Sequence, residues 1–379
     1  MIYFDNSATT KPYKEVLETY SKVSEVYFGN PSSLHTLGKE AEMLLDQGRD
    51  QIAKLLKVNK KEIIFTSGGT EGNNLAIKGT ALEHKNRGKH LITTSVEHAS
   101  NYEAFAQLEK FGFEVTFLNV NESGEISISE LKDALRDDTI LVSMIHVNNE
   151  LGSIQPIKEV GELLKDYPKV YFHVDHVQGM TKVPISFKDC YIDLCTISGH
   201  KFHGPKGTGV LYVRQGVKLF SLLTGGVQEN NLRAGTENIP GNVAMAKALR
   251  LSMGKFVDNK NHLNELRNRL VNSLREIDGI VVNSPDNGAP HIVNFSLPGI
   301  KPEVVIQALG ERKIYVSTKS ACSSKLNEPS RILMVTGLGQ ERAESAIRAS
   351  FAFENTKEEV DEFVNALKII FLQLKEVMR

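Results

Sequence analysis

Cys322 lies in the stretch TKSACSSK (318–325), where its neighbours are hydroxyls, lysines and one alanine. A free cysteine is among the most buried residue types and usually behaves as a small hydrophobe. Packing explains a thiol in a soft polar loop poorly, so nucleophilic chemistry is the better interpretation. The other two cysteines, Cys190 and Cys195, stand five residues apart in a strand-like segment, where they would face opposite sides. We interpret these two as buried structural residues.

A lysine with access to a ligand follows another strand-like run. Residues 198–209, SGHKFHGPKGTG, form a glycine-flanked loop in which Lys201 is closer to the strand than Lys206. A lysine at such a place can form a Schiff base, because the strand fixes its backbone while the loop gives access. A solvated turn lysine is the plain alternative, and the loop alone does not decide between the two.

A glycine-rich stretch, TSGGTEGNN (66–74), stands between a strand-like and a helical pattern. Paired glycines let the backbone approach a ligand, and the first N–H groups of a helix bind phosphate. Thr70 adds a hydroxyl. A tight turn with an N-cap threonine accounts for the pattern equally well. The signatures of dinucleotide-binding and P-loop proteins do not occur here.

The motif HVDHVQG begins at His173 and ends a further strand-like run. Its acid, Asp175, could pair with a protonated ring nitrogen, which is what pyridoxal phosphate requires of a protein. Metal binding by His173, Asp175 and His176, with His200 or His203 as a further ligand, is the rival interpretation. Alternation along a strand places His176 on another face than Asp175, so we expect no metal site.

Two late stretches carry weaker signals. LRAGTENIPG (232–241) is polar and glycine-rich between helical patterns, which is typical of a turn. Arg348 stands among apolar residues in AIRASFAF. A lone arginine there indicates either a salt bridge or a bidentate clamp on a substrate carboxylate.

Together these stretches resemble the NifS/IscS family of cysteine desulfurases, within the fold-type I, class V aminotransferase group. The similarity runs nearly from end to end. It is carried by DNSATT, GNPSSLH, TSGGTEGNN, EHAS, VNNELGSIQPI, SGHKFHGPKG, RAGTEN and SACSS. The spacing from Cys322 to Glu-Pro-Ser (328–330) resembles the group with a long cysteine loop.

The resemblance implies a role for each matching residue. Lys201 would bind pyridoxal 5′-phosphate covalently, and His98 would stack on its ring and help to move protons. Asp175 would pair with the ring nitrogen, and Gln178 would hydrogen-bond the phenolic oxygen. Cys322 would be the nucleophile that receives sulfur.

The remaining roles concern the two anionic groups. The resemblance places the cofactor phosphate on Thr70, Ser198 and His200. Thr236 would reach the phosphate site of the other subunit, which implies a homodimer. Residues near the substrate carboxylate would be Asn148, which also belongs to the cofactor site, Arg348 and Asn30.

The implied activity converts L-cysteine to L-alanine and leaves a persulfide on Cys322, which passes sulfur to an acceptor protein. The acceptor would serve iron–sulfur cluster assembly, tRNA thiolation or thiamine synthesis. Alternatives on the same scaffold are a selenocysteine lyase, another pyridoxal-phosphate-dependent lyase, and a plain aminotransferase. A non-catalytic sulfur-relay scaffold would be expected to have lost Lys201, Asp175 or Cys322, and all three are present.

Three short stretches depart from the family pattern. DHVQ replaces the usual DAxQ, so that His176 stands where a small residue is usual. GGVQENN (225–231) and SFA (350–352) replace GGGQE-R-G and SLG. None of these changes removes a chemical group that the mechanism needs.

Repeated apolar runs indicate the elements that must position these residues. Seven of them are typical of buried strands, and helical patterns such as 71–84 and 128–136 separate the earlier ones. This alternation predicts an α/β protein of the fold-type I class with a mostly parallel seven-stranded sheet, whose carboxyl edge carries the ligand site. The expected strands are 62–65, 90–94, 114–120, 139–145, 170–175, 193–198 and 209–213.

The pattern changes from about residue 255 onward. An amphipathic helix over 260–277 leads to short strands at GIVVN and HIVNFSL, and further helices are expected near 302–310 and 357–377. We predict a large cofactor-binding domain over 15–250. A smaller α+β domain would comprise 1–14 and 251–379 and carry the cysteine loop.

Length and composition agree with a two-lobed globular enzyme. The chain has 379 residues, 41% of them hydrophobic and 24% charged. A net charge of -1 gives no global attraction for nucleic acid or membrane surfaces, and no apolar run is long enough to cross a bilayer. The N-terminus lacks the features of a signal peptide, and three cysteines argue against a disulfide framework. We therefore expect a cytoplasmic protein.

Overall fold

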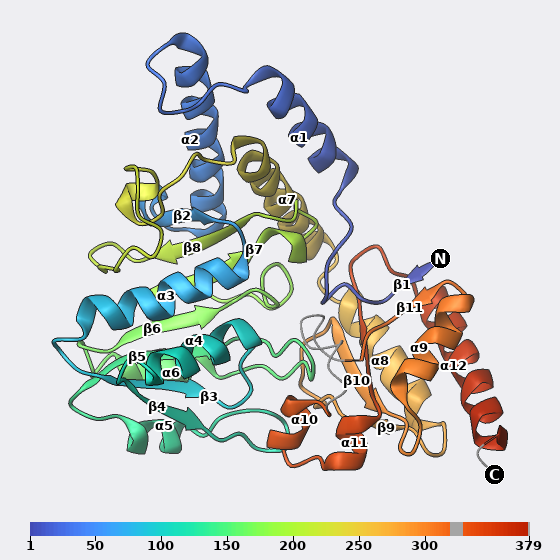
Figure 1. Ribbon diagram of the computed structural model, residues 1–379. Helices are drawn as coiled ribbons and strands as arrows, with labels where there is room; N and C mark the ends of the chain where they lie inside the picture. Colours follow the sequence, from blue (N-terminus) through green and yellow to red (C-terminus); the bar gives the residue numbers. More distant parts are fainter. Residues whose placement is uncertain (319–328, 378–379) are drawn as a thin grey trace.

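A seven-stranded sheet forms the centre of the molecule (Figure 1). The computed structural model describes residues 1–318 and 329–377, so the predicted nucleophile Cys322 lies outside the described residues. All seven apolar runs belong to this sheet, and the predicted fold class is confirmed. The strands are β2 (Ile63–Thr66), β3 (His90–Thr94), β4 (Glu114–Leu118), β5 (Thr139–Ile145), β6 (Tyr171–Asp175), β7 (Leu194–Ser198) and β8 (Gly209–Val213).

The strand order is β2-β8-β7-β6-β5-β3-β4. Neighbours from β7 to β4 pair in parallel, whereas β8 runs antiparallel to both β2 and β7. The parallel arrangement brings the carboxyl ends of β5, β6 and β7 to one edge of the sheet. In open α/β sheets, ligands bind at this edge.

Helices cover both faces of the large sheet (Figure 1). On one face α3 (Gly69–His84) and α4 (Ala99–Glu109) share an apolar cluster with β3 and β5. Gly72 lets α3 approach β7, because a Cβ atom there would come within 2.8 Å of Thr196 Cγ2. The other face packs against α1 (Lys14–Val26), α2 (Thr36–Leu56), α5 (Ile128–Ala134), α6 (Ile157–Leu164) and α7 (Ile239–Asp258).

A second, smaller sheet has its own apolar core. It is antiparallel, in the order β12-β10-β9, and packs with three long helices. These elements are β9 (Val281–Val282), β10 (Ile292–Ser296), β12 (Ala346–Ser350), α8 (His262–Arg275), α9 (Pro302–Glu311) and α12 (Lys357–Val377). The short helices α10 (Arg331–Val335) and α11 (Gln340–Glu344) complete this part.

The N-terminal segment connects the two parts. β1 (Ile2–Tyr3) pairs in parallel with β11 (Ile314–Tyr315), and the chain then passes the large sheet before α1 begins at Lys14. The boundary expected at residue 250 lies inside α7, which continues to Asp258. The division into two domains stays a prediction.

Both cysteines of the described chain are free and buried in the same core, which confirms their structural interpretation. The strand-like interpretation is wrong for Cys190, which lies in a turn before β7, whereas Cys195 lies on β7. Within residues 1–318 and 329–377, no helix is long and apolar enough to cross a membrane.

Candidate active site

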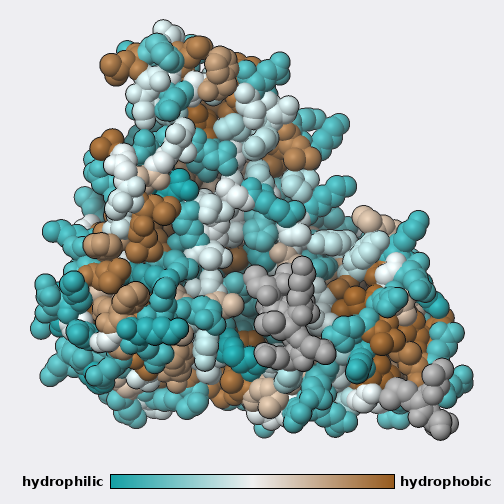
Figure 2. Space-filling model, viewed as in Figure 1, coloured by the Kyte–Doolittle hydropathy of each residue, from teal (hydrophilic) through white to brown (hydrophobic). Residues whose placement is uncertain are grey.

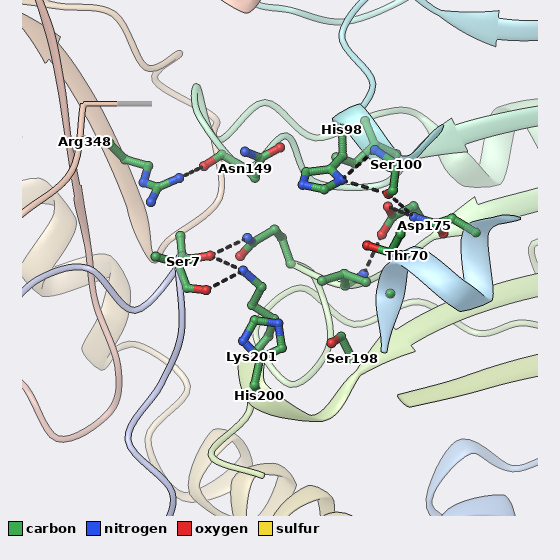
Figure 3. A pocket seen from close by; sticks show the side chains of 16 residues that line it. Ser7, Thr70, His98, Ser100, Asn149, Asp175, Ser198, His200, Lys201 and Arg348 are labelled. Atoms are coloured by element: carbon green, nitrogen blue, oxygen red, sulfur yellow. Dashed lines mark hydrogen bonds between the residues drawn. The ribbon is translucent and has the colours of Figure 1, made fainter. Parts of the chain in front are cut away.

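A cavity of about 240 Å³ opens at the carboxyl edge of the large sheet (Figure 3). The last residues of three adjacent strands line it: Ile145 of β5, Asp175 of β6 and Ser198 of β7. The sheet topology therefore creates the cavity, because parallel neighbours end at the same edge. Arg348 of β12 closes it from the side of the smaller sheet.

Asp175 is the buried acid of the cavity. Its Oδ2 accepts a hydrogen bond of 2.7 Å from Asn73 Nδ2 of α3, and its Oδ1 accepts one of 3.0 Å from Val177 N. Burial raises the pKa of this carboxyl, while the two hydrogen bonds and the positive charge of Lys201 oppose the rise. A positively charged ring nitrogen bound beside Asp175 would further stabilise the negative charge of this carboxylate.

Lys201 faces the same cavity from the short helix η2 (Gly199–Lys201), directly after β7. Its Nζ donates a hydrogen bond of 2.9 Å to the carbonyl oxygen of Ala8, and another to that of Ser7. The main chain of Lys201 is also held, because Lys182 Nζ donates to its carbonyl oxygen at 2.8 Å. The N-terminal segment and η2 therefore fix this lysine together.

His98 stands on the opposite wall as the N-cap residue of α4. Its Nδ1 accepts a hydrogen bond of 3.1 Å from Ser100 N, so the proton of the neutral ring sits on Nε2. Burial lowers the pKa of His98 to about 4, and the positive charges of Lys201 and Arg331 add to the effect. The ring is therefore neutral at physiological pH.

An anion-binding cradle lies at the start of α3. Gly69 and Thr70 line the cavity there and present the free N–H groups of a helix N-terminus. The hydroxyl of Ser198 is buried, and among the described residues it has no hydrogen-bond partner. Gly68 has φ 150°, a conformation that side-chain-bearing residues rarely adopt, and a Cβ atom there would lie 3.7 Å from Ser198 Oγ. His200 also lines the cavity. A phosphate would satisfy the buried hydroxyl.

Arg348 is 1% exposed and already holds two partners. Its Nη2 forms an ion pair of 2.9 Å with Asp5, and its Nη1 donates to the carbonyl oxygen of Asn149 at 2.7 Å. The guanidinium lines the cavity in this orientation. The sequence indicated either a salt bridge or a clamp for a substrate carboxylate. Arg348 forms the salt bridge with Asp5, and it also faces the cavity where a carboxylate could bind.

The expected position of Asn148 in the site is wrong, and its neighbour Asn149 lines the cavity instead (Figure 3). Asn148 is fully buried, and its Oδ1 accepts hydrogen bonds from Glu150 N at 2.9 Å and Leu151 N at 2.8 Å. Its Nδ2 donates to the carbonyl oxygen of Val96. The oxygen and the nitrogen of this amide are both hydrogen-bonded to the main chain, so the side chain stabilises the local turn and does not face a ligand.

The other expected site residues divide into two groups. Gln178 lines the cavity, and its amide donates a hydrogen bond of 2.9 Å to the carbonyl oxygen of Ser7. Thr236 and Asn30 are exposed and do not line the cavity of their own chain.

The rival metal cluster does not form. The His173 ring is hydrogen-bonded to Ser143 and Thr196, whereas Nδ1 of His176 lies 2.8 Å from Nδ1 of His146. Among the described residues, no three His, Cys, Asp or Glu side chains come together as metal ligands. The alternation argument placed His176 correctly, away from Asp175.

Sequence reasoning assigned no role to several residues that shape the cavity. Asn73, Ser100, Ser7, Ala8 and Asn149 all line it. Each belongs to a stretch that carried the family resemblance, so the signal lay in motifs whose individual members could not be assigned. An accessible lysine, a buried carboxylate and a phosphate cradle at a sheet edge define the site of a pyridoxal-phosphate enzyme.

Comparisons with known proteins agree with this class. Residues 2–363 match the family described as aminotransferase class-V. The chain is 47% identical over 380 residues to the NifS/IcsS protein homolog of Lactobacillus delbrueckii subsp. bulgaricus, which covers 100% of this chain and 99% of the relative. It is 43% identical to the cysteine desulfurase IscS of Methanosarcina thermophila, over 99% of this chain and 93% of the relative.

A solved NifS-like protein has the same fold, with a TM-score of 0.92 and 36% identity over 97% of this chain and 98% of that one. The chain therefore belongs to the class V aminotransferase family, among the IscS and NifS cysteine desulfurases. Members of this family depend on pyridoxal 5′-phosphate, and so does this chain.

Proposed function

We propose that this protein is a cysteine desulfurase that converts L-cysteine to L-alanine and transfers the sulfur to Cys322 as a persulfide. A protein acceptor then takes the sulfur from Cys322. The observation that carries this proposal is the convergence of Lys201, Asp175 and His98 on one cavity, in a chain related to cysteine desulfurases over its whole length.

Each of these three residues has a task that its surroundings support. Bound pyridoxal phosphate supplies an electron sink for the negative charge left when an amino acid loses its α-proton. Lys201 Nζ would hold the cofactor until the amino group of the substrate displaces it, and the freed amine would then take this proton. In the structure this Nζ donates to the carbonyl oxygens of Ser7 and Ala8. Asp175 would keep the ring nitrogen protonated, and His98, being neutral, would stack on the ring and could accept a proton.

The residues proposed for the two anionic groups lie on opposite sides of the cavity, with Arg348 on one side and Thr70 and Ser198 on the other (Figure 3). The phosphate rests on the start of α3, with Thr70, the unpartnered Ser198 hydroxyl and His200 around it. The substrate carboxylate binds Arg348, whose planar guanidinium suits a carboxylate, and Asn149 beside it. Gln178 reaches the phenolic oxygen of the cofactor.

A homodimer completes the site in this proposal. Thr236 is exposed in its own chain and reaches the phosphate of the partner. Asn30 is also exposed and lies outside the cavity of its own chain. Separate apolar side chains stand among hydrophilic ones over α1 and α2 (Figure 2). Near Asn30, Phe28 is 70% exposed and Leu34 is 90% exposed. Large exposed apolar residues of this kind support an interface between two copies.

The large domain carries the cofactor in this proposal, and the smaller one presents Cys322 to the substrate. The acceptor belongs to iron–sulfur cluster assembly, tRNA thiolation or thiamine synthesis, and transfer from the persulfide to each class separates them. The two free cysteines of the described chain support a reducing compartment such as the cytoplasm.

Incubation of the purified holoenzyme with L-cysteine tests the function. We expect L-alanine and persulfide sulfur in equal amounts, and Cys322→Ser should abolish sulfur release while the visible absorption of the bound cofactor persists. A plain aminotransferase would instead form the keto acid. Desulfuration of L-cysteine by the Cys322→Ser variant at the wild-type rate would contradict the persulfide route, and activity on selenocysteine alone would favour the lyase.

A further inference from the structure

The loop that carries His98 is held from the side of the large sheet by Glu97. This carboxylate is 1% exposed and accepts hydrogen bonds from Thr94 Oγ1, Asn101 Nδ2 and Ile145 N, at 2.7, 2.7 and 2.8 Å. These donors belong to β3, α4 and β5. The Glu97 carboxylate therefore fixes the loop to the large sheet and to α4. It makes no hydrogen bond to the carbonyl oxygens of Ser95 and Glu97, because a carboxylate only accepts.

Arg331 holds these two carbonyl oxygens from the opposite side. Its Nη2 donates to the carbonyl oxygen of Glu97 at 2.6 Å, and its Nη1 donates to that of Ser95. Its guanidinium carbon also lies 4.3 Å from the ring centre of Tyr102, on α4. One side chain of α10 thus grips the loop immediately before His98 and the helix immediately after it.

The base of Arg331 is itself anchored. The preceding residue, Ser330, is buried and caps α10 by accepting a hydrogen bond from Leu333 N. Its hydroxyl donates to Glu150 Oε2 at 2.7 Å. Glu150 follows Asn149, which lines the cavity. The start of α10 is therefore fixed against the wall of the cavity. Because its backbone is fixed, Arg331 can hold the His98 loop in one position.

Neither helix stability nor ion pairing explains this arginine. Arg331 is the first residue of α10, where the positive end of the helix dipole disfavours a cation. Among the described residues no carboxylate pairs with it. A planar fork of N–H donors suits two carbonyl oxygens that lie two residues apart. The contact with the His98 loop is therefore the one that accounts for Arg331 at this position.

We propose that Arg331 is a positioning residue for His98, because it fixes the two carbonyl oxygens and the helix that flank this histidine. The inference rests on the proposed function, since His98 is presented to the cofactor. Its charge has a second effect of the same kind, because the nearby guanidinium contributes to the lowered pKa of His98. Loss of Arg331 therefore disturbs both the orientation and the protonation of the ring.

The test compares Arg331→Leu, Arg331→Lys and Arg342→Leu in the holoenzyme. Arg342 is a matched control, because it is also half-buried and its guanidinium bridges Asn283 Oδ1 and the carbonyl oxygen of Val282, away from the cavity. The measurements are the visible absorption of the bound cofactor, the pH profile of kcat/KM for L-cysteine, kcat, KM and thermal unfolding.

For Arg331→Leu we expect an altered absorption spectrum and a fall in kcat of about 10- to 100-fold, with a smaller change in KM. The acid limb of the pH profile should move to higher pH, because removal of a positive charge raises the pKa of His98. Arg331→Lys should restore the pH profile more than kcat, since an ammonium keeps the charge but lacks the fork. Arg342→Leu should keep the wild-type spectrum and kcat.

Wild-type spectrum, pH profile and kcat in Arg331→Leu would overturn the proposal, as would equal losses in Arg331→Leu and Arg342→Leu. If Arg331→Leu does not fold, Arg331→Lys decides, because the proposal requires a reduced kcat in that variant and a wild-type kcat would overturn it. A wild-type protein that binds the cofactor but does not desulfurate L-cysteine would contradict the proposed function alone. The spectra of the variants would still test Arg331.

Discussion

At the scale of single residues, two adjacent asparagines divide structure from function. The side-chain amide of Asn148 makes all its hydrogen bonds to main-chain groups. The side chain of Asn149 makes no hydrogen bond among the described residues and lines the cavity. Identical chemistry therefore serves two tasks, and the hydrogen bonds of each amide decide which task it performs.

This difference gives a prediction for the two alanine variants. Asn148→Ala leaves two buried N–H groups and one carbonyl oxygen without partners, so the free energy of unfolding should fall by about 2–4 kcal/mol. Asn149→Ala should change it by less than about 1 kcal/mol and instead raise KM for L-cysteine. Urea unfolding and steady-state kinetics measure both effects. The reverse assignment, with a raised KM and full stability in Asn148→Ala, would return Asn148 to the site.

The same pair shows where sequence reasoning about the site ended. The motif VNNELGSIQPI predicted the right segment, and Lys201, Asp175, His98, Thr70, Gln178 and Ser198 all reach one cavity as expected. The sequence did not indicate which asparagine faces inward. That choice depends on a local turn closed by the Asn148 side chain, and hydrophobic periodicity carries no information about such a turn.

At the scale of elements, Glu229 fastens the edge of the large sheet. It accepts two hydrogen bonds from Arg49 of α2, at 2.6 and 2.7 Å, and a third of 2.9 Å from Phe65 N of the edge strand β2. Glu229, Asn230 and Asn231 all have positive φ, and a run of three such residues is costly unless it is held in place. The carboxylate therefore joins a helix, the edge strand β2 and a strained segment.

Glu229→Ala should consequently destabilise the protein by about 3–5 kcal/mol, because it leaves the Arg49 charge and the Phe65 N–H group without their partner. The exposed pair of Arg269 and Asp361 is the control, since it is also 2.6 Å long but each side chain is 45% exposed. Asp361→Ala should change the urea midpoint little. Equal midpoints for the two variants would contradict the role of Glu229.

The elements themselves were the most predictable feature. Seven apolar runs of four to seven residues became the seven strands. Apart from the edge strand β4, these strands are almost wholly buried, and such strands need continuous apolar sequence. The predicted domain boundary at 250 stays a prediction, and it lies inside α7, which continues to Asp258. The five-residue helices α10 and α11 are too short for a periodic signal, yet α10 carries the arginine that holds the His98 loop.

At the scale of the whole molecule, one site draws on distant parts of the chain. Ser7, His98, Lys201 and Arg348 meet at a single cavity, although more than 300 residues separate the first from the last. Sheet topology accounts for the middle two, and the pairing of β1 with β11 brings in the N-terminal segment. Thr236 and Asn30 remain outside, and for Thr236 this is expected if it serves a second subunit.

Hybrid dimers test this arrangement. Co-expression of differently tagged Lys201→Ala and Thr236→Ala chains allows purification of the mixed dimer alone. If Thr236 acts in the partner's site, one site of this dimer combines an intact Lys201 with an intact Thr236, while the other lacks both. The hybrid should then show about half the wild-type activity per dimer.

If Thr236 acted in its own chain, the hybrid would show only half the activity of the Thr236→Ala homodimer. A monomer in light scattering would contradict the homodimer itself. Restoration of activity in the hybrid is therefore specific for a shared site, because neither parent dimer contains a site with both residues intact.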